Sequence, residues 1–375
     1  MPWREVSTMS LRREFIMLAM QASANRRELC RRFGISAKTG YKWLERYQGE
    51  GFDGLGDRSR RPQHSPARLD AALEQAIVQL RNRHPAWGGR KLRRRLQVLG
   101  YQPIPSPSTI TAVLRRQGLL PAVPAPHAWQ RFECAVPNEL WQMDFKGHFP
   151  MSTGRCHPLT VLDDHSRFNL ALRACANEQG LTVQGELTTT FRRYGLPQRM
   201  LMDNGSPWGD DATHVLTPLT VWLLHLGVEV SHSRPYHPQT VGKDERFHRT
   251  LKTEVLCRSD FHDLPHCQRR FDRWRCVYNL ERPHDALDLD VPANHYQPSP
   301  RSFPERLPTI EYAPGDSVRK VQAKGELSYQ GQVFRISKAL RGYPVALRPT
   351  QHDGILSVHF CHSQVAEIDL RNPYK

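Results

Sequence analysis

The fold of the largest part of this chain is decided at residues 138–145, which read Asn138-Glu139-Leu140-Trp141-Gln142-Met143-Asp144-Phe145. From here the sequence alternates between short apolar runs, typical of strands, and longer stretches with apolar residues three and four apart, typical of helices. This alternation predicts one mixed α/β sheet. The expected strands are 140–149, 159–162, 168–172, 199–202 and 228–231, and the expected helices are 182–194, 216–226, 243–256 and 265–278.

Three carboxylates in this region have unusual settings. Asp144 lies in an apolar strand, where an unpaired carboxylate is unfavourable unless it meets cations. Asp203 ends a short apolar strand just before an Asn-Gly turn, and Glu245 lies one turn into a helix. Two Asp and one Glu from separate elements supply the hard oxygen ligands that Mg²⁺ prefers. Two such ions can hold the attacking and leaving oxygens of a phosphoryl transfer, so we expect Asp144, Asp203 and Glu245 to be metal-binding catalytic residues.

Polar residues around Glu245 are expected to contact DNA. Arg249 and Lys252 follow Glu245 by four and seven residues and therefore share its helical face, from which they can reach phosphates. Tyr236 and His237 lie in a polar, proline-punctuated loop before the helix and can stack on a frayed DNA end. His248 and His284 are expected to be DNA-facing or structural rather than catalytic.

A rival pair of carboxylates is formed by Asp163 and Asp164 at the end of a predicted strand. These residues suit either a metal site or an ordinary turn, and both readings stay open. The eight cysteines include no Cys-x-x-Cys pair, which favours reduced thiols over a disulfide framework. Two His/Cys clusters, at 257–267 and 359–362, lack zinc-finger spacing, so structural zinc is not expected.

The positive charge of the chain is concentrated in its first third. Residues 1–136 hold 24 lysines and arginines against 10 acidic residues, and the remaining residues hold 29 against 27. A basic module attached to a nearly neutral remainder predicts a partner that is a polyanion, here double-stranded DNA. No apolar run reaches the roughly 18 residues of a membrane span, and no secretory signal is evident, so we expect a cytoplasmic protein.

Two helical units are expected within this basic part. Residues 11–48 have the spacing of three short helices, with Ser36 placed to cap the third, which is the plan of a helix-turn-helix. The predicted DNA contacts of its last helix are Lys38, Thr39, Lys42 and Arg46. A second, related unit is expected at 69–118, with Ser106 at the cap of its third helix. Its predicted DNA contacts are Arg90, Lys91 and Arg94.

The chain is thus predicted to contain several domains joined by linkers. The linker at 51–68 carries Arg58, Arg60 and Arg61, which suit either a DNA groove or a plain tether. The final part is expected to form a small β-barrel. The predicted boundaries are 1–50 and 69–118 for the helix-turn-helix units, 138–290 for the α/β core, 316–375 for the β domain, and 51–68, 119–137 and 291–315 for the linkers.

These motifs, in order, resemble the integrase catalytic core shared by retroviral integrases and many bacterial insertion-sequence transposases. The matching stretches are Trp141-Gln142-Met143-Asp144, Asp203-Asn204-Gly205, His237-Pro238-Gln239-Thr240 and Gly242-Lys243-Asp244-Glu245-Arg246-Phe247-His248-Arg249-Thr250-Leu251-Lys252. In the bacterial group the core has a tail that resembles Tyr278-Asn279, Arg282-Pro283-His284 and Leu287.

The resemblance implies a DDE transposase with a ribonuclease-H-like fold, two Mg²⁺ or Mn²⁺ ions, and a homo-oligomer that brings two transposon ends together. Two features depart from the family. The 41 residues between Asp203 and Glu245 exceed its usual spacing, and Val241 replaces a residue that is often polar. Two alternatives are a DNA-binding regulator with a silent core and a ribonuclease-H-like nuclease that hydrolyses without joining.

Overall fold

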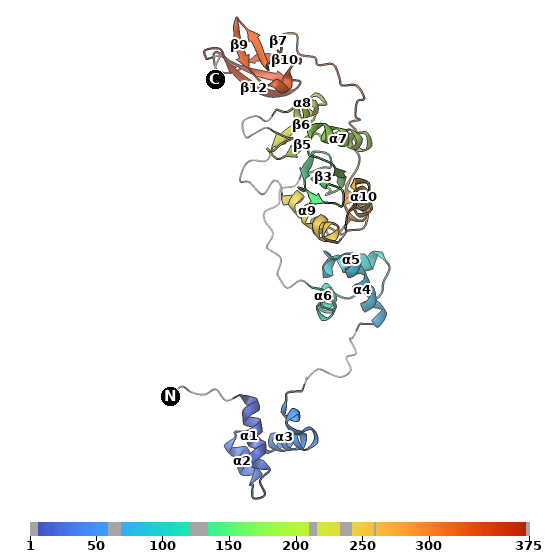
Figure 1. Ribbon diagram of the computed structural model, residues 1–375, viewed down its shortest axis with the longest axis vertical. Coiled ribbons are helices and arrows are strands. Elements are labelled where there is room, and N and C mark those ends of the chain that lie inside the picture. Colours follow the sequence, from blue (N-terminus) through green and yellow to red (C-terminus); the bar gives the residue numbers. More distant parts are fainter. Residues whose placement is uncertain are drawn as a thin grey trace. The chain divides into compact units, whose positions relative to one another are not determined.

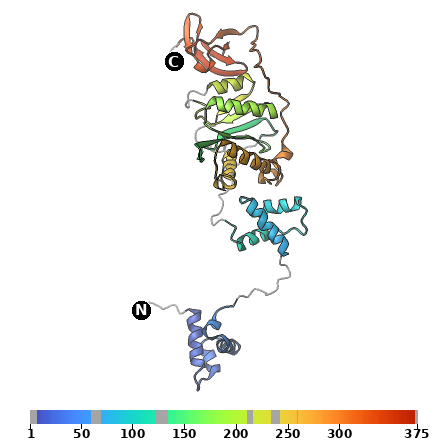
Figure 2. The ribbon, with the colours of Figure 1, turned by 45° about the vertical axis from the view of Figure 1, so that its right-hand side comes forward.

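The structure is a computed structural model that describes residues 7–58, 69–120, 134–209, 216–232, 242–258 and 260–372. The chain divides into two compact units, residues 1–68 and 69–375, which are considered separately (Figures 1 and 2). Within the described residues, no helix has both the length and the apolar character needed to cross a membrane.

The first unit is the predicted three-helix domain. Its helices are α1 (Thr8–Ala19), α2 (Arg26–Arg32) and α3 (Ala37–Glu50). Ser36 caps α3 as predicted, because its hydroxyl accepts a hydrogen bond from the Thr39 amide. Gly40 lets α3 approach α2 closely, since a Cβ there would lie 2.4 Å from Cys30 Sγ. The expectation that 51–68 contributes nothing to a core is wrong at its start, where the 3₁₀-helix η1 (Gly51–Leu55) buries Leu55 completely.

The second unit begins with a further three-helix domain. It consists of α4 (Ala71–Arg83), α5 (Gly89–Val98) and α6 (Pro107–Arg116). Its core is formed by apolar residues that are fully or almost fully buried, among them Ile77, Trp87, Leu92, Ile110 and Leu114. Ser106 caps α6, which confirms the predicted start of that helix.

The α/β part of the second unit has one mixed sheet. Its strands are β1 (Leu140–Phe145), β2 (Phe149–Pro150), β3 (Arg155–Asp163), β4 (Asn169–Cys175), β5 (Arg199–Met202) and β6 (Glu229–His232). The central strand β1 pairs antiparallel with β3 and parallel with β5, while β4 and β6 extend the sheet on either side. This arrangement confirms the predicted mixed sheet and is ribonuclease-H-like. The strand predicted at 140–149 ends at Phe145. The chain then turns at Gly147, whose φ is +79°.

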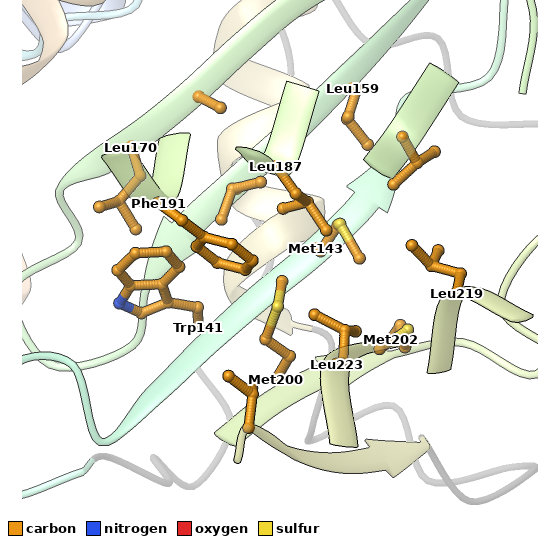
Figure 3. Packing of buried hydrophobic residues seen from close by; sticks show 14 of the residues in the cluster. Trp141, Met143, Leu159, Leu170, Leu187, Phe191, Met200, Met202, Leu219 and Leu223 are labelled. Carbon is orange, nitrogen blue, oxygen red and sulfur yellow. The ribbon is translucent and has the colours of Figure 1, made fainter. Parts of the chain in front are cut away.

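Helices cover both faces of this sheet (Figure 1). Helices α7 (Gly180–Tyr194) and α8 (Pro218–His225) pack on one face, against a cluster that includes Trp141, Met143 and Met200 (Figure 3). Helices α9 (Gly242–Glu254) and α10 (Leu264–Leu280) pack on the other face through Phe247, Phe271 and Trp274. Strands β3 and β4 therefore contribute to both cores, with Leu159 and Val161 on one side and Leu162 and Leu172 on the other.

The core extends beyond the predicted boundary at residue 290. Tyr296 and Phe303 pack against the cluster that contains Trp141, so part of 291–315 belongs to the core. The last domain contains β7 (Ser317–Lys320), β8 (Glu326–Tyr329), β9 (Gln332–Arg335), β10 (Pro344–Pro349), β11 (Ile355–Phe360) and β12 (Ser363–Asp369). Strands β7, β10, β11 and β12 form a four-stranded sheet, and β8 and β9 form a separate hairpin. The structure therefore shows a β-rich domain, but not the closed barrel that the sequence predicted. Val221 and Leu224 of α8 join its apolar core.

Candidate active site

Asp144 lies near the end of β1, on the face of the sheet that α9 covers. Because strand side chains alternate, Trp141 and Met143 enter the core beneath α7, and Asp144 points to the opposite side. Its partner across the antiparallel pair is Thr160 of β3. The Asp144 side chain is 28% exposed, so it is partly desolvated but still accessible.

Asp203 lies at the same edge of the sheet, directly after β5. The strands β1 and β5 run parallel, and their carboxyl ends therefore meet at one edge. The side chain is exposed and accepts a 3.1 Å hydrogen bond from the Gly205 amide. The Asp203 carbonyl accepts a 2.7 Å hydrogen bond from His232 Nδ1, which ties the end of β5 to the end of β6.

Burial and neighbouring negative charge act on both aspartates. Burial, followed by the charge of Asp203, raises the pKa of Asp144 from 3.8 to about 7. Burial also raises the pKa of Asp203, and Glu178 adds a further negative charge that acts on both groups. Carboxylates that are desolvated beside like charge favour a cation between them. Glu178 is therefore part of the electrostatic environment of the site, and nothing in its sequence setting indicated this.

Glu245 lies on the exposed face of α9 together with Arg249 and Lys252, as the helical spacing predicted. The preceding residue Asp244 points inward instead: it is 3% exposed, and burial together with the charge of Asp144 raises its pKa well above the usual value. Among the described residues, no three His, Cys, Asp or Glu side chains converge closely enough to hold a metal. The structure thus brings Asp144 and Asp203 together but does not add Glu245, whose role stays a prediction.

The rival pair is occupied by hydrogen bonds within the protein. Asp163 accepts hydrogen bonds from the amides of Asn138 and Ser166, both at 2.7 Å, and from the Ser166 hydroxyl. Asp164 has a completely buried side chain that accepts from the Cys134 amide and Gln142 Nε2 and forms a 2.5 Å ion pair with Lys243. These contacts support the turn reading for Asp163 and Asp164.

Helix α3 presents part of the predicted DNA-binding set. Lys38 and Lys42 are exposed, and Tyr41 and Glu45, which were not predicted, lie on the same face. Thr39 is half-buried with its hydroxyl against the capping serine. Arg46 is half-buried, 5.1 Å above the Trp43 ring, so it contributes more to packing than the sequence suggested.

The basic residues of α5 have partners inside the protein. Arg90 and Lys91 both form ion pairs with Asp285, and Lys91, largely buried, has a pKa lowered to about 8 by burial and then by Arg282. Arg94 is exposed and keeps its predicted availability for DNA. In this structure Arg90 and Lys91 therefore join the three-helix domain to the core, which the sequence did not predict.

The remaining predicted DNA contacts divide between exposed and undescribed residues. Arg58 is exposed and pairs with Glu50. Arg60, Arg61, Tyr236 and His237 lie outside the described residues.

Family comparisons agree with this architecture. Integrase core domain models match residues 135–238 and 226–292. A helix-turn-helix domain matches 11–63, a homeodomain-like domain matches 39–114, and the C-terminal domain of IS481 family transposases matches 316–374. The chain has an integrase core. It is a relative of bacterial insertion-sequence transposases, as its motifs indicated.

Individual relatives match only part of the chain. It is 28% identical over 158 residues to the insertion element IS407 uncharacterized 31.7 kDa protein of Burkholderia multivorans, which covers 42% of this chain and 55% of the relative. The insertion element IS476 uncharacterized 39.2 kDa protein of Xanthomonas euvesicatoria is 26% identical over 42% of this chain and 44% of its own length. The chain thus spans about half the length of these curated relatives.

Solved structures of viral integrases are also similar to this chain. The HTLV-2 integrase catalytic core domain in complex with magnesium is 13% identical, covers 44% of this chain and 99% of that one, and has a TM-score of 0.35. A chain of the simian T-cell lymphotropic virus intasome in complex with a PP2A regulatory subunit is 14% identical. The match covers 78% of this chain and 94% of that one, with a TM-score of 0.39.

Proposed function

We propose that this chain is a transposase that binds the ends of an insertion sequence, cleaves the DNA there and joins the 3′ ends to target DNA. The observation that carries the proposal is the pair Asp144 and Asp203 at one edge of an integrase-type sheet. Burial raises the pKa of both carboxyl groups, and the charge of Asp203 raises that of Asp144 further. Such a site is unfavourable for the protein alone and becomes favourable when it binds a cation.

The donor set fits divalent metal ions. Carboxylate oxygens are ligands that Mg²⁺ and Mn²⁺ accept, and Glu245 on the exposed face of α9 would complete the set with Asp144 and Asp203. Two such ions, when bound, would stabilise the charge that develops on the attacking and leaving oxygens of a phosphoryl transfer.

The chain's own residues would bind and align the DNA. Lys38 and Lys42 of α3 are exposed on a short helix that suits the major groove, and they would hold the transposon end. Arg249 and Lys252 share the exposed face of Glu245, from which they would hold phosphates beside the carboxylates. Two ends must be joined in a coordinated way, so we propose a homo-oligomer, as the resemblance to integrases implies.

The test is a strand-transfer assay on the full chain with labelled DNA from the ends of the element and Mg²⁺. The wild type is expected to give joined products. Asp144→Asn, Asp203→Asn and Glu245→Gln are expected to bind the ends but not to cleave or join them. A matched control is Asp288→Asn, because Asp288 is exposed with a φ of +50°, a conformation that Asn adopts readily.

The products separate the alternatives. Hydrolysis without joining would indicate a nuclease, and binding without cleavage would indicate a regulator. Asp244→Asn adds a further discrimination, because the charge of Asp144 acts on the buried Asp244 in the structure. Full activity of Glu245→Gln together with loss in Asp244→Asn would assign the third carboxylate to Asp244.

A further inference from the structure

A buried histidine connects helix α9 to the strand that carries Asp144. His248 follows Glu245 by three residues and lies on the adjacent, buried side of the helix, where it is 7% exposed. Its Nε2 lies 2.9 Å from Thr160 Oγ1, and its Nδ1 lies 3.8 Å from Asp144 Oδ2. Thr160 Oγ1 also lies 2.9 Å from the Asp144 carbonyl oxygen. One side chain of α9 therefore contacts both the carboxylate and, through Thr160, the backbone of residue 144.

The hydrogen-bond donors in this chain of contacts can be assigned. A carbonyl oxygen only accepts, so the single hydroxyl hydrogen of Thr160 is donated to Asp144. Thr160 Oγ1 must then accept from His248, which places a hydrogen on Nε2. The other ring nitrogen, Nδ1, lies 3.8 Å from Asp144 Oδ2.

A second contact fixes the start of the same helix. Lys243, two residues before Glu245, forms an ion pair with the fully buried Asp164 at the end of β3. In the part of the chain that the structure describes, the Glu245 side chain makes no hydrogen bond or ion pair. Its position relative to Asp144 therefore depends on contacts made by its neighbours on the buried face of α9.

We propose that His248, acting through Thr160, is a positioning residue that fixes the register of α9 against β1 and so places Glu245 relative to Asp144. This inference rests on the proposed function, because it concerns the same carboxylates. His248 is not a metal ligand in this scheme. It holds the strand and the helix together through Thr160. Loss of a partner that orients a ligand typically costs about 10–100-fold in metal affinity or activity.

The sharpest variant is Thr160→Val, which keeps the shape of the side chain and removes its hydroxyl. We expect the single-turnover strand-transfer rate to fall about 10–100-fold and the Mg²⁺ concentration for half-maximal rate to rise by a similar factor. End binding should stay unchanged. His248→Leu should behave alike, and Thr160→Ser should recover most of the rate because it restores the hydroxyl. His248→Gln can retain a donor to Thr160 and should lie between.

The matched control is Thr190→Val. Thr190 is also buried, and its hydroxyl also donates to a backbone carbonyl, that of Glu186, but it lies in α7. If Thr160 had only a general structural role, both Val variants would lose folded protein and neither would shift the Mg²⁺ midpoint. A second readout, independent of turnover, is Mn²⁺ binding to the folded protein measured by electron paramagnetic resonance.

The outcomes distinguish this inference from the proposed function. If the wild type joins no DNA, the proposed function fails, and Mn²⁺ affinity still tests the positioning role. If the wild type joins DNA while Thr160→Val and His248→Leu keep its Mg²⁺ midpoint and Mn²⁺ affinity, the positioning role is overturned. Poor folding of His248→Leu would leave the decision to Thr160→Val and Thr160→Ser.

Discussion

Two pairs of aspartates lie in the same sheet and meet opposite environments. Asp163 and Asp164, at the end of β3, are 1% exposed, and each accepts three contacts from protein donors. Asp144 and Asp203, at the ends of β1 and β5, are more exposed. Burial raises the pKa of Asp144, Asp203 and Asp163, but the charge of Asp203 adds to the shift of Asp144. The oxygens of the first pair are occupied by protein donors, whereas the second pair lies beside further negative charge.

The difference shows how structural and functional carboxylates can be distinguished. A buried carboxylate whose oxygens are all satisfied stabilises local structure, and adding a cation there would displace existing partners. A desolvated carboxylate beside like charge destabilises the protein until a cation arrives. The residue type and the strand-end position are the same in both pairs, so the partners decide the role.

The largest expected effect is on catalysis. Asp144→Asn removes a charge but keeps the shape of the side chain. Removal of a residue that only supports a metal ligand can lower activity by roughly 100-fold. We expect the strand-transfer rate of Asp144→Asn to fall by more than that, because the proposed ligand itself is changed. Asp163→Asn should keep measurable activity, because its oxygens serve the turn. The comparison would be reversed by a single-turnover assay in which folded Asp163→Asn is inactive and Asp144→Asn is active.

The second effect is on the stability of the folded protein and concerns the buried Asp164. Lys243→Met leaves Asp164 buried without its cation, and breaking one side of a buried ion pair costs about 3–5 kcal/mol. Urea unfolding, followed through hydrogen exchange of peptides from β1 and β3, measures this loss in the relevant region. Arg58→Met, which removes an exposed ion pair with Glu50, is the control and should cost less than about 1 kcal/mol. Equal losses would mean that Asp164 is not held by Lys243.

The sequence predicted the positions of Asp144 and Asp203 better than it predicted the environment of Asp163 and Asp164. The apolar alternation around residue 144 and the strand at 199–202 were sufficient to place Asp144 and Asp203, because those signals are local. The fate of Asp164 depends on Cys134, Gln142 and Lys243, which are distant in sequence, so periodicity could not decide it.

Contacts between residues that are distant in sequence also limited the prediction of DNA-binding residues. Ser36 and Ser106 were recognised as helix caps because capping is a local interaction. Arg90 was assigned to DNA because it is a basic residue at the start of a helix, but its partner Asp285 is 195 residues away. His248 could have been found from its spacing to Glu245, whereas Thr160 gave no signal in the sequence.

The third effect is a gain in stability when the Asp144 carboxylate is removed. The pKa of Asp144 is raised from 3.8 to about 7 in the folded protein. Below pH 3.8 the group is protonated in both states. Between pH 3.8 and about 7 the unfolded chain loses the proton first, so stability falls as pH rises and the full penalty applies above pH 7.

Asp144→Asn should therefore be more stable than the wild type by about 2 kcal/mol at pH 8 without Mg²⁺, and nearly equal at pH 4. This figure is about half of what the shift implies, because the side chain is 28% exposed and solvent screens its charge. The measurement is urea unfolding against pH for both proteins. Identical pH dependence would show that the Asp144 carboxylate is not strained in the folded state.

The smallest effect compares the two pairs directly through a metal ion. If the site binds Mg²⁺ with a dissociation constant of roughly 1 mM, about 10 mM Mg²⁺ stabilises the folded protein by about 1.4 kcal/mol. The wild type and Asp163→Asn should both show this gain, because Asp163 is occupied by Asn138 and Ser166. Asp144→Asn should show less than half of it, since one carboxylate is missing. NaCl at equal ionic strength controls for screening, which acts on all charges rather than on one site. A full gain in Asp144→Asn combined with none in Asp163→Asn would move the metal site to the rival pair.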